Sequence, residues 1–182
     1  TSLKVSSAIN NNYAKNPFNR RGFLFTFAPM YKKYLTKEQA LQKLKQYCAY
    51  QERCHSEVTE KLYELGVYKK EHDEIIAALI EENYLNEERF AIAFAGGKFR
   101  IKQWGRVKIK YELKQKQVSE YCIKKALAAI AAEDYLKTLK KLAEEKRKTL
   151  KSEKNIFIKK RKLQDYLLQK GFEMELVRVV VG

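Results

Sequence analysis

From Thr36 onward, apolar residues recur at the three- and four-residue spacing that is typical of amphipathic helices. A capping box of Thr36 and Gln39 opens the first predicted helix. The second predicted helix carries Leu62 and ends at Gly66, since glycine is the usual residue just beyond a helix C-terminus. A further apolar stretch over 75–80 predicts a third helix, which completes a first group of three.

The same succession of helices restarts twice along the chain. Asn86 is predicted to cap one later helix and Ser119 another, because both residue types are favoured N-caps. The last restart begins near Tyr135 and is less regular. For the helix capped by Asn86, the spacing predicts a buried stripe that consists of Phe90, Phe94, Gly97 and Ile101.

The middle helices of the three predicted groups share one spacing of positions, namely i, i+4, i+8 and i+9. Leu62, Leu113 and Leu167 are equivalent in this pattern and are 51 and 54 residues apart. Similar units of about fifty residues indicate a tandem repeat, in which neighbouring units bury the apolar surface that one small unit alone leaves exposed. We therefore predict an all-α fold, an elongated tandem array of three three-helix repeats. The aligned positions are Val58, Leu62, Gly66 and Val67; Ile109, Leu113, Gln117 and Val118; and Leu163, Leu167, Gly171 and Phe172.

Composition divides the chain into a start and a repeat region. Both prolines and no acidic residue lie in residues 1–34, which we predict to be a poorly ordered basic leader. The remainder is rich in Lys, Glu, Leu and Ala, which favour helices. We expect the first repeat over 35–83, the second over 84–131 and the third over 132–182.

Charge is strongly polarised along the chain, whose formal net charge is +16. Residues 36–95 carry 8 basic and 12 acidic side chains, whereas residues 96–182 carry 24 basic and 10 acidic ones. The first repeat is therefore acidic and the other two are basic. Such segregation favours a polyanionic partner, nucleic acid or an acidic protein surface, over Lys-rich helices that are merely well solvated.

The residue types that common enzymes need are missing from the sequence. The chain has two histidines, no phosphate-binding glycine loop and no paired cysteine spacing for a metal. We therefore predict no enzyme, no catalytic residues, no metal site and no cofactor. Cys48 and Cys122 are expected in the core, and Cys54 and His55 in an exposed loop. Three cysteines, the lack of a signal-peptide pattern and the lack of a long apolar stretch favour a cytoplasmic protein that does not enter membranes.

The most informative stretch runs from residue 98 to 116 and is basic almost throughout. Arg106, Lys110 and Lys114, at i, i+4 and i+8, are predicted to form a ridge away from the core, which a polyanion would neutralise. Trp104 interrupts the stretch at a helix corner, where packing is favoured over stacking on a base. The candidate binding residues are Lys98, Arg100, Lys102, Arg106, Lys108, Lys110 and Lys114, together with Lys159, Lys160, Arg161 and Lys162 at the equivalent place of the third repeat.

Two segments of the second repeat resemble the RecX family. Residues 83–91 read NYLNEERFA, and after a basic tract residues 104–116 read WGRVKIKYELKQK. The family shows a "(G/N)YL(D/N)(D/E)ERFA" segment and then an "I-x-x-E-L-x-x-K-G-(I/V)" helix, although Gln117 stands where the family has glycine. The similarity extends over roughly residues 35–181.

The resemblance implies a regulatory protein of DNA repair and homologous recombination. RecX-like proteins bind the RecA filament, lie along its helical groove, and suppress strand exchange and ATP hydrolysis. Some also bind DNA. The expected partners are thus the RecA filament and, more weakly and in a salt-dependent way, single- or double-stranded DNA. Carried over by position, Arg106, Lys108, Lys110 and Lys114 are the contact residues that the resemblance favours. We expect a monomer.

Two other functions stay open at this point. One is a sequence-independent DNA-binding helical protein without a recombinase partner. The other is a structural adaptor between proteins whose charge serves only solubility, which the polarised charge disfavours.

Overall fold

The computed structural model describes residues 35–182, and the predicted basic leader lies outside them. Over this range the chain forms α-helices and no strands, so the all-α prediction is confirmed. None of these helices is long and apolar enough to cross a membrane. The helices are α1 (Lys37–Tyr50), α2 (His55–Glu64), α3 (Lys69–Glu81), α4 (Glu87–Lys102), α5 (Arg106–Gln115), α6 (Glu120–Ala128), α7 (Ala132–Thr149), α8 (Ile156–Lys170) and α9 (Met174–Val181).

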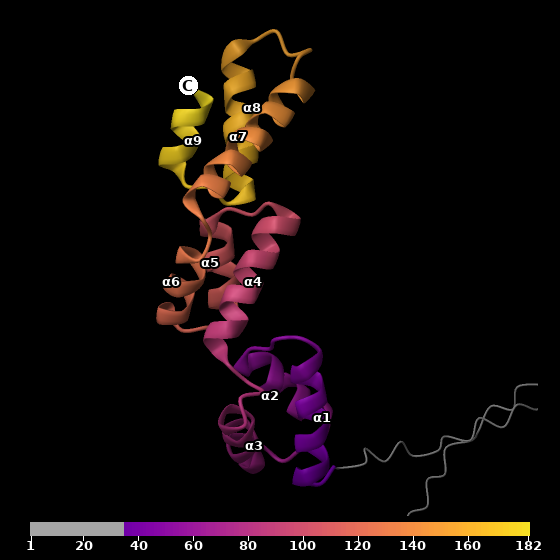
Figure 1. Ribbon diagram of the computed structural model, residues 1–182. Coiled ribbons are helices and arrows are strands. Elements are labelled where there is room, and N and C mark those ends of the chain that lie inside the picture. The colour runs from indigo at the N-terminus through magenta and orange to yellow at the C-terminus, as the bar shows by residue number, and fades with distance from the viewer. Residues whose placement is uncertain (1–34) are drawn as a thin grey trace, which may run out of the picture. The chain divides into compact units, whose positions relative to one another are not determined.

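The helices pack in three successive groups of three (Figure 1). The more extensive contacts fall within α1–α3, within α4–α6 and within α7–α9, with α4 packing most extensively against α6. We refer to these as the first, second and third groups.

Local signals at the helix ends act as the sequence predicts. Thr36 and Gln39 form the capping box of α1, and the Asn86 and Ser119 side chains cap α4 and α6. Gly66 follows α2 at φ 74° and Gly171 follows α8 at φ 90°. Gln117 takes the equivalent left-handed conformation after α5, with φ 60°. The second group thus makes the same turn without the glycine that this backbone conformation favours.

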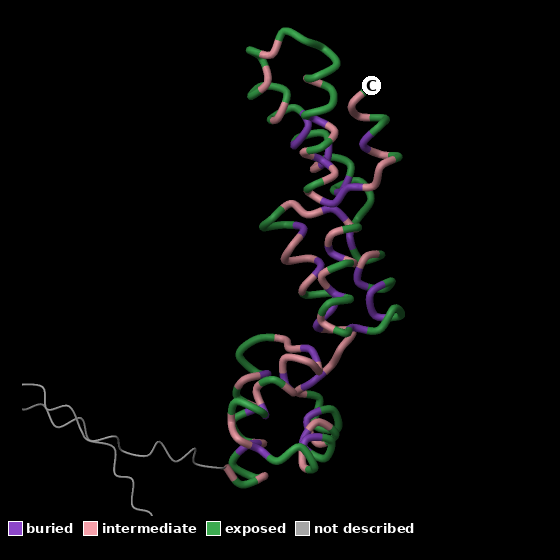
Figure 2. The backbone as a smooth tube through the Cα atoms, turned by 180° about the vertical axis from the view of Figure 1, so that it is seen from behind, coloured by how far each residue is buried: buried purple, intermediate pink, exposed green. Residues whose placement is uncertain are grey.

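Buried residues occur along all three groups, as the purple segments of the backbone in Figure 2 show. The apolar ones form two cores. One belongs to the first group and centres on side chains such as Leu44 and Leu62. The other runs through the second and third groups, from Ile109 to Leu167. Cys54, from the loop before α2, is fully buried in this second core, so the predicted exposed position for Cys54 is wrong.

The predicted stripe of α4 is wrong beyond Phe90. The residues of α4 that are buried are Phe90, Ala91, Ala95 and Phe99, whereas Phe94 and Gly97 are half-buried and Ile101 is 78% exposed. α4 packs most extensively against α6, and its buried face carries two small alanines, which permit close packing. A line of apolar side chains is therefore left at the surface of α4.

Two helix corners meet where the second group joins the third. The Gly105 N–H donates to the Lys170 carbonyl at 2.9 Å, and the Val107 N–H donates to the Gly171 carbonyl at 3.0 Å. A Cβ on Gly105 would lie 2.1 Å from the Gly171 oxygen, so only glycine permits this approach. The contact fixes the corner between α4 and α5, where the candidate binding residues are concentrated.

Candidate nucleic-acid interface

Basic and aromatic side chains alternate around the corner between α4 and α5. The Lys98 Nζ lies 5.1 Å from the ring centroid of Phe94 and 5.0 Å from that of Trp104. The Lys108 Nζ approaches the Trp104 ring to 4.7 Å. We call Phe94, Lys98, Trp104 and Lys108 the basic–aromatic strip. Such alternation of ammonium groups and rings suits single-stranded nucleic acid, whose phosphates and bases alternate in the same way.

The position of the Trp104 ring suits both roles considered from the sequence, which are packing against the core and stacking on a base. It is half-buried and packs against the core that the second and third groups share. The ammonium groups of Lys98 on α4 and of Lys108 on α5 also lie over this ring. Phe94, by contrast, is predicted to lie in the buried stripe of α4, whereas in the structure it is half-buried and its ring meets the ammonium group of Lys98.

The other predicted residues of α4 lie beside the strip. Arg100 is exposed, and its guanidinium folds back over Gly96, where an added Cβ would come within 2.8 Å of Nη1. Lys102 ends the helix and is also exposed.

The predicted ridge on α5 is already partly neutralised by the protein itself. Lys114 Nζ lies 2.5 Å and Lys110 Nζ 3.5 Å from the carboxylate of Glu120, which comes from α6. The Lys114 hydrogen bond and both lysine charges hold the pKa of this exposed glutamate below its ordinary value. The ridge that the sequence predicts a polyanion to neutralise therefore already meets an acidic side chain of the protein itself.

Arg106 differs from both lysines of the ridge because it is built into the fold. Its guanidinium carbon lies 4.2 Å from the ring centroid of Tyr135, and Nη2 donates to the Ile130 carbonyl at 3.1 Å. Its backbone N–H donates to the Tyr135 hydroxyl, which in turn donates to Glu173 at 2.6 Å. Burial and the Glu173 carboxylate raise the pKa of Tyr135, so the hydroxyl keeps its proton. The predicted placement of Arg106 on a face away from the core is wrong.

The basic cluster of the third group lies at the start of α8. Arg161 is exposed, Lys162 pairs with Glu153 at 2.7 Å, and Lys160 donates to the Gly182 carbonyl. Lys159 is half-buried. These contacts stay within the third group, so the structure does not bring this cluster together with the strip.

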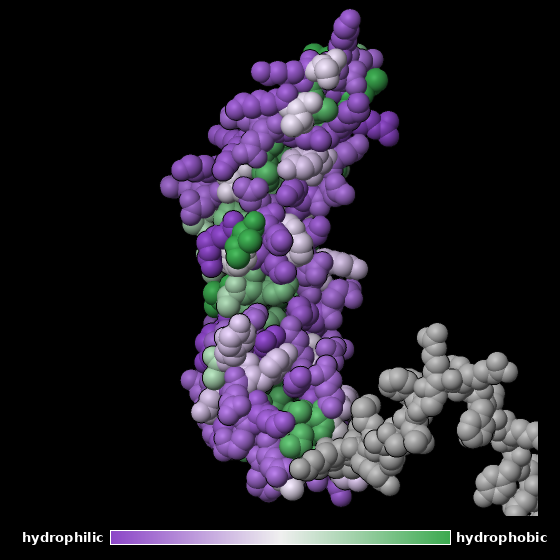
Figure 3. Space-filling model, turned by 90° about the vertical axis from the view of Figure 1, so that its right-hand side faces the viewer, coloured by the Kyte–Doolittle hydropathy of each residue, from purple (hydrophilic) through white to green (hydrophobic). Residues whose placement is uncertain are grey.

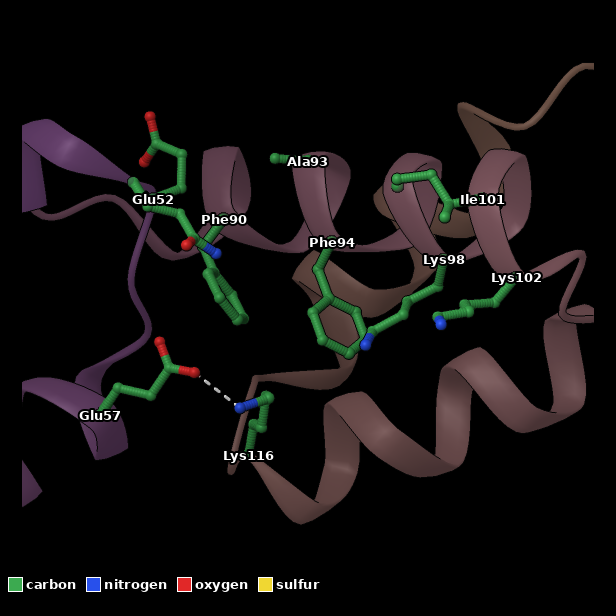
Figure 4. A pocket seen from close by; sticks show the side chains of 11 residues that line it. Glu52, Glu57, Phe90, Ala93, Phe94, Lys98, Ile101, Lys102 and Lys116 are labelled. Atoms are coloured by element: carbon green, nitrogen blue, oxygen red, sulfur yellow. Dashed lines mark hydrogen bonds and ion pairs between the residues drawn. The ribbon is translucent and has the colours of Figure 1, made fainter.

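A cavity of about 540 Å³ opens beside the strip, between the loop that precedes α2 and the outer face of α4 (Figure 4). Phe94 and Lys98 line it and so belong to both the cavity and the strip. Apolar lining comes from the line of α4 residues that includes Gly97 and Ile101. On the face that Figure 3 shows, one of the hydrophobic patches in a mostly hydrophilic surface lies at about the height of α4.

Two glutamates at one end of the cavity each have one hydrogen-bonded carboxylate oxygen and one that accepts no hydrogen bond, although Glu57 Oε2 lies 3.9 Å from Arg53 Nη1. Glu52 Oε1 accepts from Arg89 Nε at 2.5 Å, and Glu57 Oε1 accepts from Lys116 Nζ at 2.6 Å. The Oε2 atom of each is buried and without a hydrogen-bond partner. Burial alone lowers the pKa of Lys116, but the Glu57 carboxylate more than offsets this and raises it, so Lys116 is charged at neutral pH. Sequence reasoning missed this acidic end, because Glu52 and Glu57 come from the first group and meet α4 only through tertiary packing.

Comparison with known families matches two models to the second and third groups. The model described as the second three-helix domain of RecX matches residues 86–127, and the third three-helix domain of RecX matches residues 133–181. The chain belongs to the RecX family. The predicted family and helical-repeat fold are thereby confirmed.

Individual RecX proteins are similar over most of the described chain. The Regulatory protein RecX of Clostridium perfringens (strain 13 / Type A) is 35% identical over 130 residues, which are 71% of this chain and 60% of the relative. That of Bacillus cytotoxicus is 29% identical over 134 residues, 73% of this chain and 49% of the relative. The matched part thus spans about half to three-fifths of the length of these relatives.

Solved RecX structures share the fold. The crystal structure of RecX from Lactobacillus salivarius has a TM-score of 0.72 and 23% identity, covering 80% of this chain and 94% of that one. A second crystal structure, of a regulatory protein RecX, has a TM-score of 0.72 and 22% identity, covering 79% of this chain and 70% of that one.

Proposed function

We propose that this RecX-family chain binds the RecA–DNA filament in its groove and modulates it, mostly by inhibiting recombinase and ATPase activity in DNA repair and recombination. The observation that carries the proposal is the family itself, whose relatives are named regulatory proteins. The basic–aromatic strip supports it, because it offers phosphate and base contacts within the matched second group.

The proposed action is binding without catalysis. Lys98 and Lys108 neutralise phosphates and release counterions, which makes the DNA part of the binding dependent on salt. Trp104 holds both ammonium groups at one corner, and the Gly105 junction fixes that corner against the third group. We place this action in the cytoplasm, which agrees with the three buried free cysteines, and in a monomer.

A sequence-independent DNA-binding protein without a recombinase partner is the second candidate. The strip favours it, because ammonium groups alternating with rings bind a single strand unaided. The two candidates differ in whether RecA is needed.

The deciding experiment measures the DNA-dependent ATPase of RecA with increasing amounts of this protein. We expect inhibition at less than one molecule per RecA subunit, and weaker inhibition by the double variant Lys98→Gln/Lys108→Gln. The matched control is Lys43→Gln/Lys69→Gln, which removes the same charge from exposed positions of the first group. No inhibition by the parent, with DNA binding intact, would favour the second candidate.

A further inference from the structure

We propose that the cavity beside α4 binds one nucleotide unit of single-stranded DNA, with its base against Phe94 and its phosphate at Lys98 and Lys102. The inference rests on the proposed function, since it names the DNA feature that the candidate interface takes. It adds a pocket for a single unstacked base to a surface that otherwise contacts a strand only from outside.

The cavity is polarised in the way that a nucleotide is. Glu52 and Glu57 lie at one end, where Lys116 pairs with Glu57, and Lys98 and Lys102 lie at the other (Figure 4). The ring of Phe94 lies between the two ends, with the Lys116 Nζ 5.8 Å from its centroid. A base is flat and carries N–H donors on its edge, whereas its phosphate is anionic. The ring therefore matches the face of the base, the carboxylates match its donors, and the ammonium groups match the phosphate.

The carboxylate oxygens that accept no hydrogen bond favour a ligand that brings N–H donors. The buried Oε2 of Glu52 has no hydrogen-bond partner, and that of Glu57 has only a long ion pair, at 3.9 Å from Arg53 Nη1. A buried carboxylate oxygen without a hydrogen bond is costly and uncommon in a folded protein. The amino group of cytosine supplies such a donor, and carboxylates accept from it in known interfaces. Thymine has no amino group, so we expect cytosine to be preferred over thymine.

Gly97 leaves the space in which the base would lie. A Cβ added there meets nothing within 4 Å, although the residue lies inside α4. The helix would be more stable with alanine at this position, so the open space comes at a cost in helix propensity. A nucleotide within a strand fits better than a free one, because its neighbouring phosphates also reach Lys108 and the rest of the strip.

The test fills the cavity without disturbing the fold. Gly97→Leu places a side chain in the open space, and Gly97→Ala is the matched control, because both improve helix propensity but only leucine occupies the volume. Without RecA, we would measure how tightly each protein binds an oligo-dC of twelve nucleotides, an oligo-dT and an abasic strand of the same length. Fluorescence anisotropy gives the affinity, and Trp104, the single tryptophan, reports binding beside Lys98.

We expect the parent and Gly97→Ala to bind oligo-dC about 5- to 150-fold more tightly than the abasic strand, the range that one base–aromatic stack supplies. Gly97→Leu should lower the affinity for oligo-dC at least about fivefold and leave the affinity for the abasic strand unchanged. Equal binding of oligo-dC by both variants would overturn the proposal. Tighter binding of free dCMP than of the oligonucleotide would overturn the assignment to a strand.

The RecA ATPase assay, run on the same variants, separates this inference from the proposed function. If Gly97→Leu loses ATPase inhibition but binds oligo-dC as the parent does, the cavity holds a protein side chain and the proposal is wrong. If neither the parent nor any variant inhibits RecA, but Gly97→Leu still binds oligo-dC more weakly than the parent, the nucleotide pocket is supported and the proposed function is wrong.

Discussion

Arg106 and Lys108 lie two residues apart on α5, but Arg106 makes contacts that hold the fold together whereas Lys108 lies at the surface. The Arg106 guanidinium lies over the Tyr135 ring and donates to the Ile130 carbonyl, across the boundary between the second and third groups. Lys108 extends its ammonium group to Trp104 at the surface corner. Equal charge in the sequence therefore does not mean equal availability to a partner.

We expect Arg106→Ala to lower the free energy of unfolding by about 1–3 kcal/mol, because a hydrogen bond from a charged donor and a ring contact are both lost. Urea unfolding followed by circular dichroism measures this. Lys114→Ala, on the same helix and half-exposed, should change the value by no more than about 0.5 kcal/mol. Equal effects of both substitutions would contradict the structural role of Arg106.

The sequence could not reveal the pairing of the ridge. Arg106, Lys110 and Lys114 do follow one another at helical spacing, as predicted, but their partners come from α6 and α7 or the turn between them. Side chains that meet through tertiary packing leave no local signal. The spacing therefore gives the order of the basic residues along α5 but not their surroundings.

At the scale of the helices, the N-terminal caps were the most predictable feature. One of these caps also connects two helices. Ser119 caps α6, and its Oγ and N–H both donate to the Glu87 carboxylate at the start of α4, at 2.7 and 3.3 Å. Burial by itself raises the pKa of Glu87, but the hydrogen bonds from Ser119 outweigh it and hold the pKa below its ordinary value. The folded state therefore favours the ionised carboxylate.

Ser119→Ala is expected to cost about 1 kcal/mol of stability at neutral pH, which is usual for a lost N-cap. A lowered carboxyl pKa stabilises the fold above the ordinary pKa of glutamic acid, about 4.3, and this contribution disappears as the pH falls through the lowered value. The difference between parent and variant should thus shrink in acid. Urea unfolding at pH 7 and pH 3.5 checks this, with the exposed Ser152→Ala as control. A difference that grows in acid would contradict the role of Glu87.

The wrong stripe of α4 has a physical explanation at the same scale. Hydrophobicity ranks Phe94 and Ile101 above Ala91 and Ala95, so a spacing argument places the larger residues inside. The buried face of α4 nevertheless carries Ala91 and Ala95, and small residues permit the extensive packing of α4 against α6. A sequence with two overlapping apolar lines does not show which of them faces a neighbour.

The meeting of two helix corners gives a sharper prediction. Gly105→Ala would place a Cβ 2.1 Å from the Gly171 oxygen, and the backbone hydrogen bonds around it leave little room for adjustment. We expect a loss of at least about 1–3 kcal/mol, the usual range for overpacking. Gly97→Ala, at an open helix position, should instead stabilise by up to about 1 kcal/mol. Thermal unfolding of the two variants tests both signs, and a Gly105→Ala protein as stable as the parent would exclude the close contact.

Across the whole molecule, the repeat was predictable because each group reuses one pattern. Leu62, Leu113 and Leu167 are all buried, and Gly66, Gln117 and Gly171 all adopt positive φ. The sharing of the cores was not predictable, since a repeat pattern does not say which neighbours fuse. The second and third groups share one core and the first keeps its own. The cavity lies at the boundary between these two cores, which is why its acidic end was missed.

Charge is also organised at the scale of the molecule. The strip lies in the basic part of the chain, and the first group, which supplies Glu52 and Glu57, is net acidic. In the proposed DNA binding, long-range attraction would come from the net charge of +16, whereas phosphate contacts would come only from groups that reach the strand. Substitutions that change net charge equally at different places separate these two contributions.

We expect Lys98→Gln/Lys108→Gln to flatten the dependence of single-stranded DNA binding on salt. Each lost phosphate contact removes about 0.7 from the slope of log affinity against log salt, so two contacts remove about 1.4. Lys43→Gln/Lys69→Gln lowers the net charge equally but lies on exposed positions of α1 and α3, far along the chain from the strip, and should leave the slope unchanged. Titrations at four salt concentrations measure both slopes. Because glutamine keeps most of the side-chain stem over Trp104, thermal stability should stay within about 0.5 kcal/mol of the parent for each substitution. Equal slopes for the two double variants would mean that DNA senses only the overall charge and that the basic–aromatic strip makes no phosphate contacts.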